Sequence, residues 1–170
     1  MAPSAPMLGQ AIDIAEGVPT VDLQTAANNG DYISLQNVDR VMVVFTSGVG
    51  TAGDDPTLTI QQATTNAGGN VKALTFTSIF RKQAATSLAA VTEWTETTQS
   101  AANTYTNATA AEQSIIWVVE FAAEDLDVAN GFDHIRATVA DIGSNAQPGS
   151  LQYIFRPMYQ NDPVNVVSVL

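Results

Sequence analysis

Cysteine is absent from the 170 residues, and histidine occurs once. The missing thiols exclude disulfide bonds, cysteine nucleophiles and thiolate metal ligands, so packing and hydrogen bonds must hold the chain together. A zinc ion would find one imidazole and otherwise only carboxylates. We therefore expect neither a metal nor any other cofactor.

Basic residues are also scarce. Six lysines and arginines stand against 17 acidic residues, which gives a formal net charge of −11. Apart from the neighbours Arg81 and Lys82 they are isolated in the sequence, whereas a nucleic-acid surface needs clustered cations to displace counterions. Anionic lipid would repel such a chain as well. We expect no nucleic-acid partner and no membrane partner.

Long hydrophobic runs are missing too. The longest strongly apolar run, "IIWVV", has five residues and ends at Glu120, whereas a membrane-spanning helix needs about 20. The first residues lack the basic segment and apolar core of a signal peptide. Neither membrane insertion nor secretion by that route is expected.

The residue types that are abundant favour β-strands. The chain is 45% hydrophobic and 14% charged, and its many threonines and valines suit a pleated surface. Turn-forming stretches such as "NNGD", "SGVGTAGDDP" and "NAGGN" separate short apolar segments, as in sandwiches and barrels. We predict an all-β fold, a single antiparallel β-sandwich over residues 20–163, with an extended N-terminal arm (1–19) and an aliphatic C-terminal tail (164–170). The predicted strands are 20–24, 32–35, 39–47, 57–64, 72–82, 93–99, 112–122, 133–141 and 149–160.

Two of these segments differ from the rest in pattern. "RVMVVF" and "SIIWVVEF" are apolar without a break, which predicts central strands covered on both faces or buried at a subunit contact. In "LTFTSIF" the alternation of apolar and polar residues slips near Ser78, which predicts a β-bulge there.

Both chain ends carry apolar side chains where an exposed segment would not need them. We expect the arm to lie against another copy of the chain or another protein, although packing on its own domain stays open. The tail is expected either to complete a sheet edge of its own domain, which is the commoner case, or to pair with another subunit. The candidate contact residues are Met7, Leu8, Ile12 and Ile14 in the arm and Val166, Val167, Val169 and Leu170 in the tail.

The segment "EDLDVANGFDHIRATV", residues 124–139, gathers the most ligand-type groups. An EF-hand loop counted from Asp125 fails at positions 5, 6 and 12. A different cation site that uses Asp125, Asp127 and Asp133 stays open. We prefer to interpret Asn130-Gly131 as a tight turn with positive φ at both residues.

No catalytic arrangement is evident around the single histidine. His134 follows Asp133, but no G-x-S-x-G sequence supplies a nucleophile for a triad. The glycine-rich loop at residues 47–55 lacks the Lys-Ser/Thr ending of a phosphate-binding loop. We expect a protein that is not an enzyme.

Aromatic residues offer one further hypothesis, a sugar-stacking platform on a carbohydrate-binding or adhesin module. Its candidates are Trp94, Trp117, Tyr105, Tyr153 and Tyr159. Trp117 lies inside an apolar run and is expected in the core, so Trp94 is the tryptophan expected to show a face to solvent.

The order of several segments resembles a known family. "DYISLQNVDRVMVVFTSG", "PTLTIQQATTNAGGNVKALTFTSIFRK", "EWTETT", "IIWVVEFAAEDLDVANGFDHIRATVA" and "RPMYQNDP" follow one another between about residues 30 and 163. Together they resemble small virion structural proteins of tailed bacteriophages, of the head decoration (cement) type. The most specific pieces are "LDVANGFDHIRATV" and "TLTIQQAT…KALTF".

The resemblance implies a non-enzymatic β-sandwich, jelly-roll-like, located in the virion on the head surface. It also implies two partners, the major capsid protein and further copies of this chain, with a homotrimer as the expected oligomer. A structural component of the phage tail or neck is the alternative within the same class of protein.

Overall fold

The computed structural model of the chain describes residues 8–84 and 93–158. Strands make up most of this part, which confirms the predicted all-β class. The elements are α1 (Leu8–Ala11), β1 (Asp13–Asp22), β2 (Asn28–Asn29), β3 (Ile33–Ser34), β4 (Val38–Ser47), β5 (Thr57–Ala63), β6 (Lys72–Ala73), β7 (Phe76–Ala84), β8 (Thr95–Ala102), β9 (Thr104–Thr106), β10 (Ser114–Ala122), η2 (Ala123–Asp125), η3 (Val128–Asn130), β11 (His134–Val139) and β12 (Pro148–Pro157).

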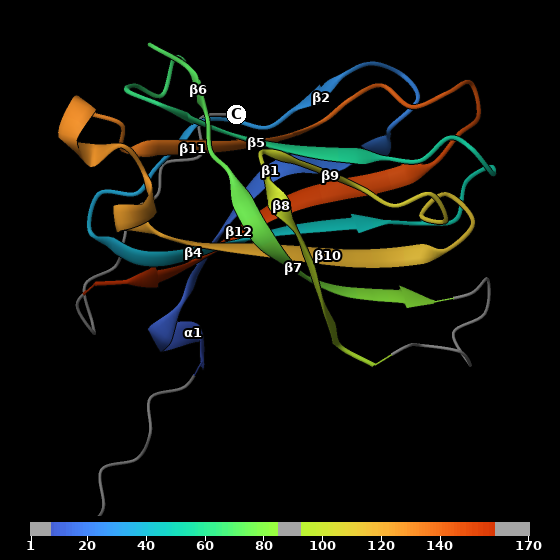
Figure 1. Cartoon of the computed structure of the whole chain (residues 1–170), viewed down its shortest axis with the longest axis horizontal. Helices are drawn as coiled ribbons and strands as arrows, with labels where there is room; N and C mark the ends of the chain where they lie inside the picture. The colour runs from blue at the N-terminus through green and yellow to red at the C-terminus, as the bar shows by residue number, and fades with distance from the viewer. Residues whose placement is uncertain (1–7, 85–92, 159–170) are drawn as a thin grey trace, which may run out of the picture.

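The strands form two antiparallel sheets that pack face to face (Figure 1). Sheet A has the strand order β1-β12-β4-β10-β7-β8. Sheet B has the order β2-β11-β5-β6, with β3 also paired to β11 and β9 to β5. The described part of the chain is therefore a two-layer sandwich, as predicted.

The connectivity is that of a jelly roll with an inserted hairpin. Four strands of sheet A, β1-β12-β4-β10, face β2-β11-β5-β9 of sheet B, and the chain passes repeatedly from one sheet to the other. The insertion between β5 and β9 supplies β7 and β8, which extend sheet A beyond β10. The predicted jelly-roll-like arrangement is thus present, in an enlarged form.

The core lies between the sheets and is made by alternate residues of their strands. Trp117 on β10 contacts Tyr105 on β9 of the other sheet, with ring centroids 4.7 Å apart, and Phe45 on β4 at 5.5 Å. Each large side chain buried here contributes about 1.5–3 kcal/mol. The largest fully buried side chains are Trp117, Tyr153, Phe45, Phe155, Leu23, Ile33, Leu58, Ile60, Ile79, Ile115, Ile135 and Leu151.

Tyr153 joins the two sheets by a hydrogen bond across the core. Its hydroxyl accepts a hydrogen bond of 2.7 Å from the backbone N–H of Ala137 on β11 and donates to the carbonyl of Asp31 at 3.4 Å. Burial raises the pKa of Tyr153 well above its ordinary value. A Cβ at Gly30 would lie 2.6 Å from the carbonyl oxygen of Ala137 and 3.0 Å from this hydroxyl, so a glycine is required beside it.

The predicted N-terminal arm of residues 1–19 is wrong in its second half. From Asp13 onward the chain forms β1, which pairs with β12 at the edge of sheet A. Pro19 is compatible with this position because an edge strand has backbone N–H groups without sheet partners. Register shifts between Glu16 and Val18 and between Val18 and Val21 interrupt the pairing. A truncation that probes the arm must therefore stop at residue 12.

The other strand predictions are accurate in the middle of the sheets and less so at their margins. The two apolar runs are β4 and β10, central in sheet A, and the register shift between Phe76 and Ser78 confirms the predicted irregularity. The segment 72–82 is divided into β6 and β7, in different sheets. The short strands β2 and β9 were not predicted.

Candidate interaction face

The side of sheet A that points away from the core is partly apolar. Partners in register on antiparallel strands have their side chains on the same face of a sheet, so the pairing of β1, β12, β4, β10 and β7 defines what this surface, the outward face of sheet A, contains. Its apolar members, in cross-strand order, are Ile14, Ile154, Met42, Val44, Val118, Phe80 and Ile116.

Several of these side chains are open to solvent. Ile14 is 58% exposed and Ile116 is 39% exposed, while Met42, Val44 and Ile154 are half-buried. Single exposed apolar residues are common on protein surfaces, but a contiguous group typically marks a contact surface. The unbroken apolar pattern of "RVMVVF" and "SIIWVVEF" follows from this arrangement, because the residues between the core positions belong to the outward face of sheet A.

A shallow hollow of about 160 Å³ lies on this face. Its apolar lining includes Ile12, Met42 and Ile154. Ile12 comes from the turn between α1 and β1, so the N-terminal segment completes the hollow rather than extending away from it.

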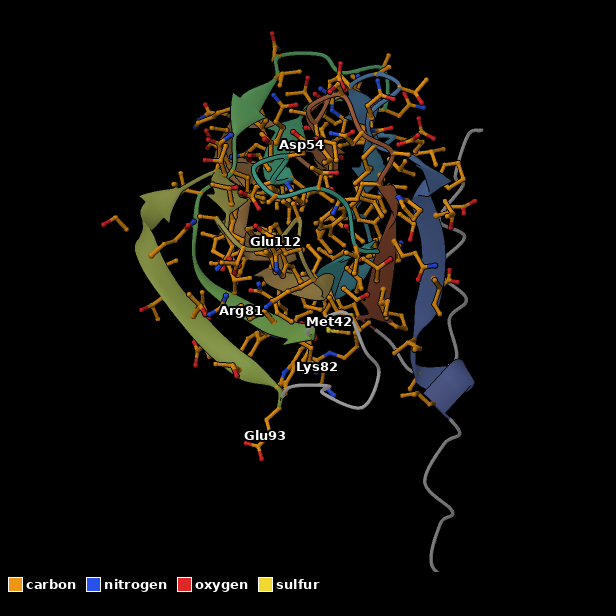
Figure 2. All side chains as sticks on the ribbon, turned by 90° about the vertical axis from the view of Figure 1, so that its right-hand side faces the viewer. Met42, Asp54, Arg81, Lys82, Glu93 and Glu112 are labelled. Atoms are coloured by element: carbon orange, nitrogen blue, oxygen red, sulfur yellow. The ribbon has the colours of Figure 1, made fainter. Side chains whose placement is uncertain are left out.

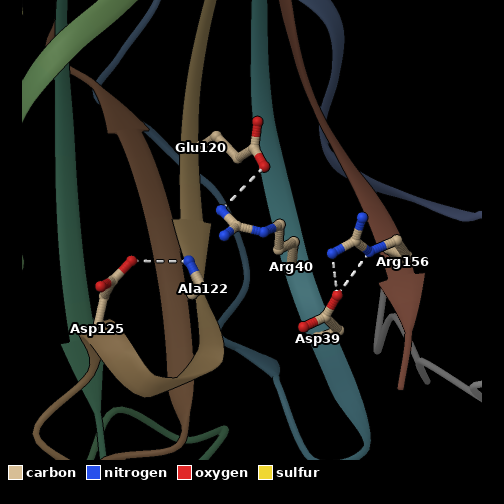
Figure 3. A network of polar contacts seen from close by, with 6 residues as sticks. All are labelled: Asp39, Arg40, Glu120, Ala122, Asp125 and Arg156. Carbon is tan, nitrogen blue, oxygen red and sulfur yellow. Dashed lines mark hydrogen bonds and ion pairs between the residues drawn. The ribbon is translucent and has the colours of Figure 1, made fainter. Parts of the chain in front are cut away.

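Two ion pairs border the hollow (Figure 3). Arg40 on β4 contacts Glu120 on β10, with 3.3 Å between Nη1 and Oε1, and the Nε of Arg156 on β12 donates to Asp39 Oδ2 at 2.6 Å. All four side chains are substantially exposed. Such pairs contribute about 0–1 kcal/mol to stability, so their main effect is to set the charge pattern around the apolar centre.

At the other side of the face, an aromatic pair extends the apolar surface. Trp94 is 48% exposed and stacks on Phe80, with ring centroids 6.1 Å apart and an interplanar angle of 7°. The ammonium of Lys82 lies 6.0 Å from the Trp94 ring centroid. The predicted exposure of Trp94 is confirmed.

The outward face of sheet A is also nearly balanced in charge. It carries three cations, Arg40, Lys82 and Arg156, against five carboxylates, Glu16, Asp22, Asp39, Glu96 and Glu120. This balance, three minus five, leaves the face with two of the eleven net negative charges of the chain. Two copies, or a copy and another acidic protein, therefore repel each other only weakly through this face.

The structure places only part of the predicted contact set. Ile14 belongs to the outward face of sheet A and Ile12 lines its hollow, whereas Leu8 is 72% exposed in α1. Met7 and the tail residues Val166, Val167, Val169 and Leu170 lie outside the described residues. Met42 and Ile116 were missed because an apolar run in a central strand does not reveal which alternate residues face outward.

The acid-rich segment after β10 is not the two-residue turn that was predicted. It contains η2 and η3 and links β10 in sheet A to β11 in sheet B, so the flanking strands do not form a hairpin. Gly131 has φ of 80°, but Asn130 is not among the non-glycine residues with positive φ. Here the chain crosses from one layer to the other, which requires a longer connection than a tight hairpin turn.

The three carboxylates of the proposed cation site have separate partners. Asp125 accepts a hydrogen bond from the backbone N–H of Ala122 at 2.7 Å (Figure 3), Asp127 pairs with Lys72 at 2.5 Å, and Asp133 lies 2.5 Å from His134 Nδ1. Within residues 8–84 and 93–158, no group of three or more histidine, aspartate or glutamate side chains is placed to hold a metal ion. The alternative cation site at Asp125, Asp127 and Asp133, which the sequence left open, is therefore not formed.

The hydrogen-bond partners of Asp127 affect its titration. A hydrogen bond from Lys72, with a second from Asn130, lowers the pKa of Asp127 below its ordinary value of 3.8. The carboxylate form is favoured in the folded state, so the resulting stabilisation is present above pH 3.8 and is lost as the pH falls through the lowered pKa.

Replacing Lys72 by methionine should raise the pKa of Asp127 back toward 3.8. The measurement is a titration of carboxyl ¹³C chemical shifts by NMR. Lys82→Met is the matched control, because Lys82 lies on sheet A near Trp94 and its loss should leave Asp127 unchanged. An unchanged Asp127 titration in Lys72→Met would show that this ion pair does not control the group.

Three of the five candidates for an aromatic platform are not at the surface. Trp117 and Tyr153 are fully buried and Tyr105 is 7% exposed, so all three belong to the core. Tyr159 lies outside the described residues. The expected core position of Trp117 is confirmed, but sequence spacing did not show that Tyr105 and Tyr153 also lie between the sheets.

Comparison with known proteins assigns no family. No protein-family model matches the chain, and no curated protein matches it at a significant level. Among the described residues, no helix is long and apolar enough to cross a membrane.

Proposed function

We propose that this chain is a non-enzymatic structural protein of a tailed-bacteriophage particle, a head decoration protein that binds the assembled shell. Two observations support the proposal. The order of sequence segments between about residues 30 and 163 resembles that family, and the outward face of sheet A combines exposed apolar side chains with nearly balanced charge. The second observation carries the proposal, because it identifies a surface suited to association in a strongly acidic chain.

A small β-sandwich domain can perform this function through many weak contacts. A contact of modest strength, repeated over a symmetric shell, gives strong overall attachment when copies also contact one another. Binding to the assembled shell, and not to free subunits, stabilises the shell by mass action. We assign the outward face of sheet A to the contact with the major capsid protein and expect the copies to form a trimer.

The fold alone does not favour this function over others. Jelly rolls occur in viral capsid proteins and in lectins and cupins alike, so the strand order is compatible with several functions. A tail or neck location would use the same kind of surface, and electron microscopy of particles that carry the chain distinguishes it from a head location.

The proposal predicts that a charge in place of an exposed apolar side chain on the outward face of sheet A weakens attachment. Ile116→Lys should weaken binding to emptied phage heads at least about tenfold, because the ammonium would have to be desolvated in the contact. The measurement is co-sedimentation with heads stripped of this protein, from a phage that encodes it. Far-ultraviolet circular dichroism checks that the variant is folded.

Val71→Lys is the matched control for this variant. Val71 is 46% exposed, close to the 39% of Ile116, and lies next to β6 of sheet B. Its replacement should leave binding unchanged. Equal binding by the two variants would contradict the assignment of the face, and failure of the unmodified chain to bind heads would contradict the proposed function.

A further inference from the structure

A polar hollow at one end of the sandwich lies apart from the outward face of sheet A. It is open to solvent, has a volume of about 270 Å³, and sits near the end of β7 and the starts of β8 and β10. Figure 2 looks onto this end and shows Arg81 on β7. The described lining consists of hydrogen-bonding side chains: Arg81, Gln83, Thr95, Asn107, Thr109 and Gln113.

Arg81 is the charged member of this lining. It pairs in register with Trp117, so its side chain is on the inner side of sheet A, opposite to that of Lys82. Its Nη1 donates to Gln83 Oε1, and within residues 8–84 and 93–158 no carboxylate lies at ion-pair distance from it. A guanidinium has five N–H donors, so most of them remain for a ligand.

The neighbouring amides are oriented so that they also present donors. Gln83 Nε2 donates to Asn107 Oδ1 at 3.4 Å and to Gln113 Oε1 at 3.1 Å. Asn107 Oδ1 accepts two more hydrogen bonds, from the N–H and the hydroxyl of Thr109 at 3.0 and 2.8 Å. Because these amide oxygens are used internally, the amide NH₂ groups of Asn107 and Gln113 remain as donors.

The two threonine hydroxyls of the lining can accept hydrogen bonds from a ligand. Thr95 donates its hydroxyl proton to the carbonyl of Glu93 at 3.3 Å, and Thr109 donates to Asn107 Oδ1 at 2.8 Å. Each hydroxyl oxygen can then only accept from a ligand. The hollow thus combines a cationic, donor-rich part with hydroxyl acceptors.

We infer that this hollow binds a sugar acid, with the ligand's carboxylate held by Arg81 and the amides of Asn107 and Gln113. Carboxylates are bound by guanidinium groups through short, charge-assisted hydrogen bonds. The hydroxyl groups of the same ligand donate to Thr95 and Thr109. This site is independent of the proposed attachment to a phage shell, because it uses the inner side of β7 and the loop before β10.

The test is an NMR titration of ¹⁵N-labelled protein with sodium glucuronate, at constant ionic strength maintained with sodium chloride. We expect saturable shifts of the side-chain amide signals of Asn107 and Gln113. The expected dissociation constant is on the order of 1 mM, the scale reached by a ligand of about a dozen non-hydrogen atoms. Because this readout uses the unmodified chain, it does not depend on the folding of a variant.

Arg81→Gln should weaken glucuronate binding at least about tenfold, because it removes the charge that pairs with the carboxylate. Lys82→Gln is the matched control, since it removes one positive charge from the adjacent position on the opposite face of β7 and should bind as the unmodified chain does. Melting temperatures establish that both variants are folded.

Three ligand controls complete the test. Glucose should cause no saturable shift, and acetate and inorganic phosphate should bind more weakly than glucuronate. Absence of amide shifts with glucuronate, equal shifts with glucose, equal affinity for acetate or phosphate, or unchanged binding in Arg81→Gln would each overturn the inference.

Discussion

Trp117→Ala is expected to lower the free energy of unfolding by about 3–5 kcal/mol, a large part of the 5–15 kcal/mol typical of a domain. Trp117 is fully buried and packs against Tyr105 from the opposite sheet and Phe45 from the neighbouring strand. Alanine would leave a cavity between the layers that these rings cannot fill without moving both sheets. Urea unfolding followed by circular dichroism measures the change.

Trp94→Ala is the matched control, because the same side chain is removed from a site that is 48% exposed. Its loss should cost less than about 1 kcal/mol. If Trp117→Ala does not fold, Trp117→Phe keeps an aromatic ring and removes an indole N–H that has no acceptor among the described residues. That variant should lose less stability than alanine. Equal losses at positions 94 and 117 would contradict the placement of Trp117 in the core.

The same residue illustrates what sequence patterns can establish. Trp117 lies in an apolar run of the length of one strand, bounded by polar residues, and this local information predicted a central, buried strand. The irregularity near Ser78 was likewise visible as a change of phase within one segment. Features that depend on residues close together in the sequence were therefore predictable.

Features that depend on pairing between distant segments were not. β1 contains Gly17 and Pro19 and has no clear alternation, and only the free edge of β12 explains why it is a strand. β2 and β9 have two and three residues, too short for a periodic signal. The chain around Asn130 resembles a hairpin turn in sequence, yet its flanking strands belong to different sheets.

The candidate sites show the same limitation. The pattern of "RVMVVF" allowed a subunit contact, but the outward face of sheet A combines residues from five strands whose order cannot be derived from the sequence. The hollow around Arg81 depends on Gln83, Asn107 and Gln113, which meet only after β7 pairs with β10. No single segment contains a motif for it.

Tyr153→Phe is expected to destabilise the fold by about 1–3 kcal/mol, because it leaves the buried N–H of Ala137 without its acceptor. Tyr32→Phe is the matched control: the Tyr32 hydroxyl is buried and has no hydrogen-bond partner among the described residues, so its loss should be neutral or slightly stabilising. Urea unfolding at neutral pH compares both variants with the unmodified chain, and equal effects would contradict a structural role for the link between the sheets.

The pH dependence supplies a second, independent measurement on Tyr153. Burial raises the pKa of Tyr153 in the folded state above its ordinary value of 10.0, so above that pH the unfolded chain releases a proton that the folded chain keeps. The free energy of unfolding should therefore fall as the pH rises above 10. Tyr153→Phe removes this contribution, and its stability should decline less steeply over the same range. Identical slopes for the two proteins would show that Tyr153 ionises as freely in the fold as in the unfolded chain.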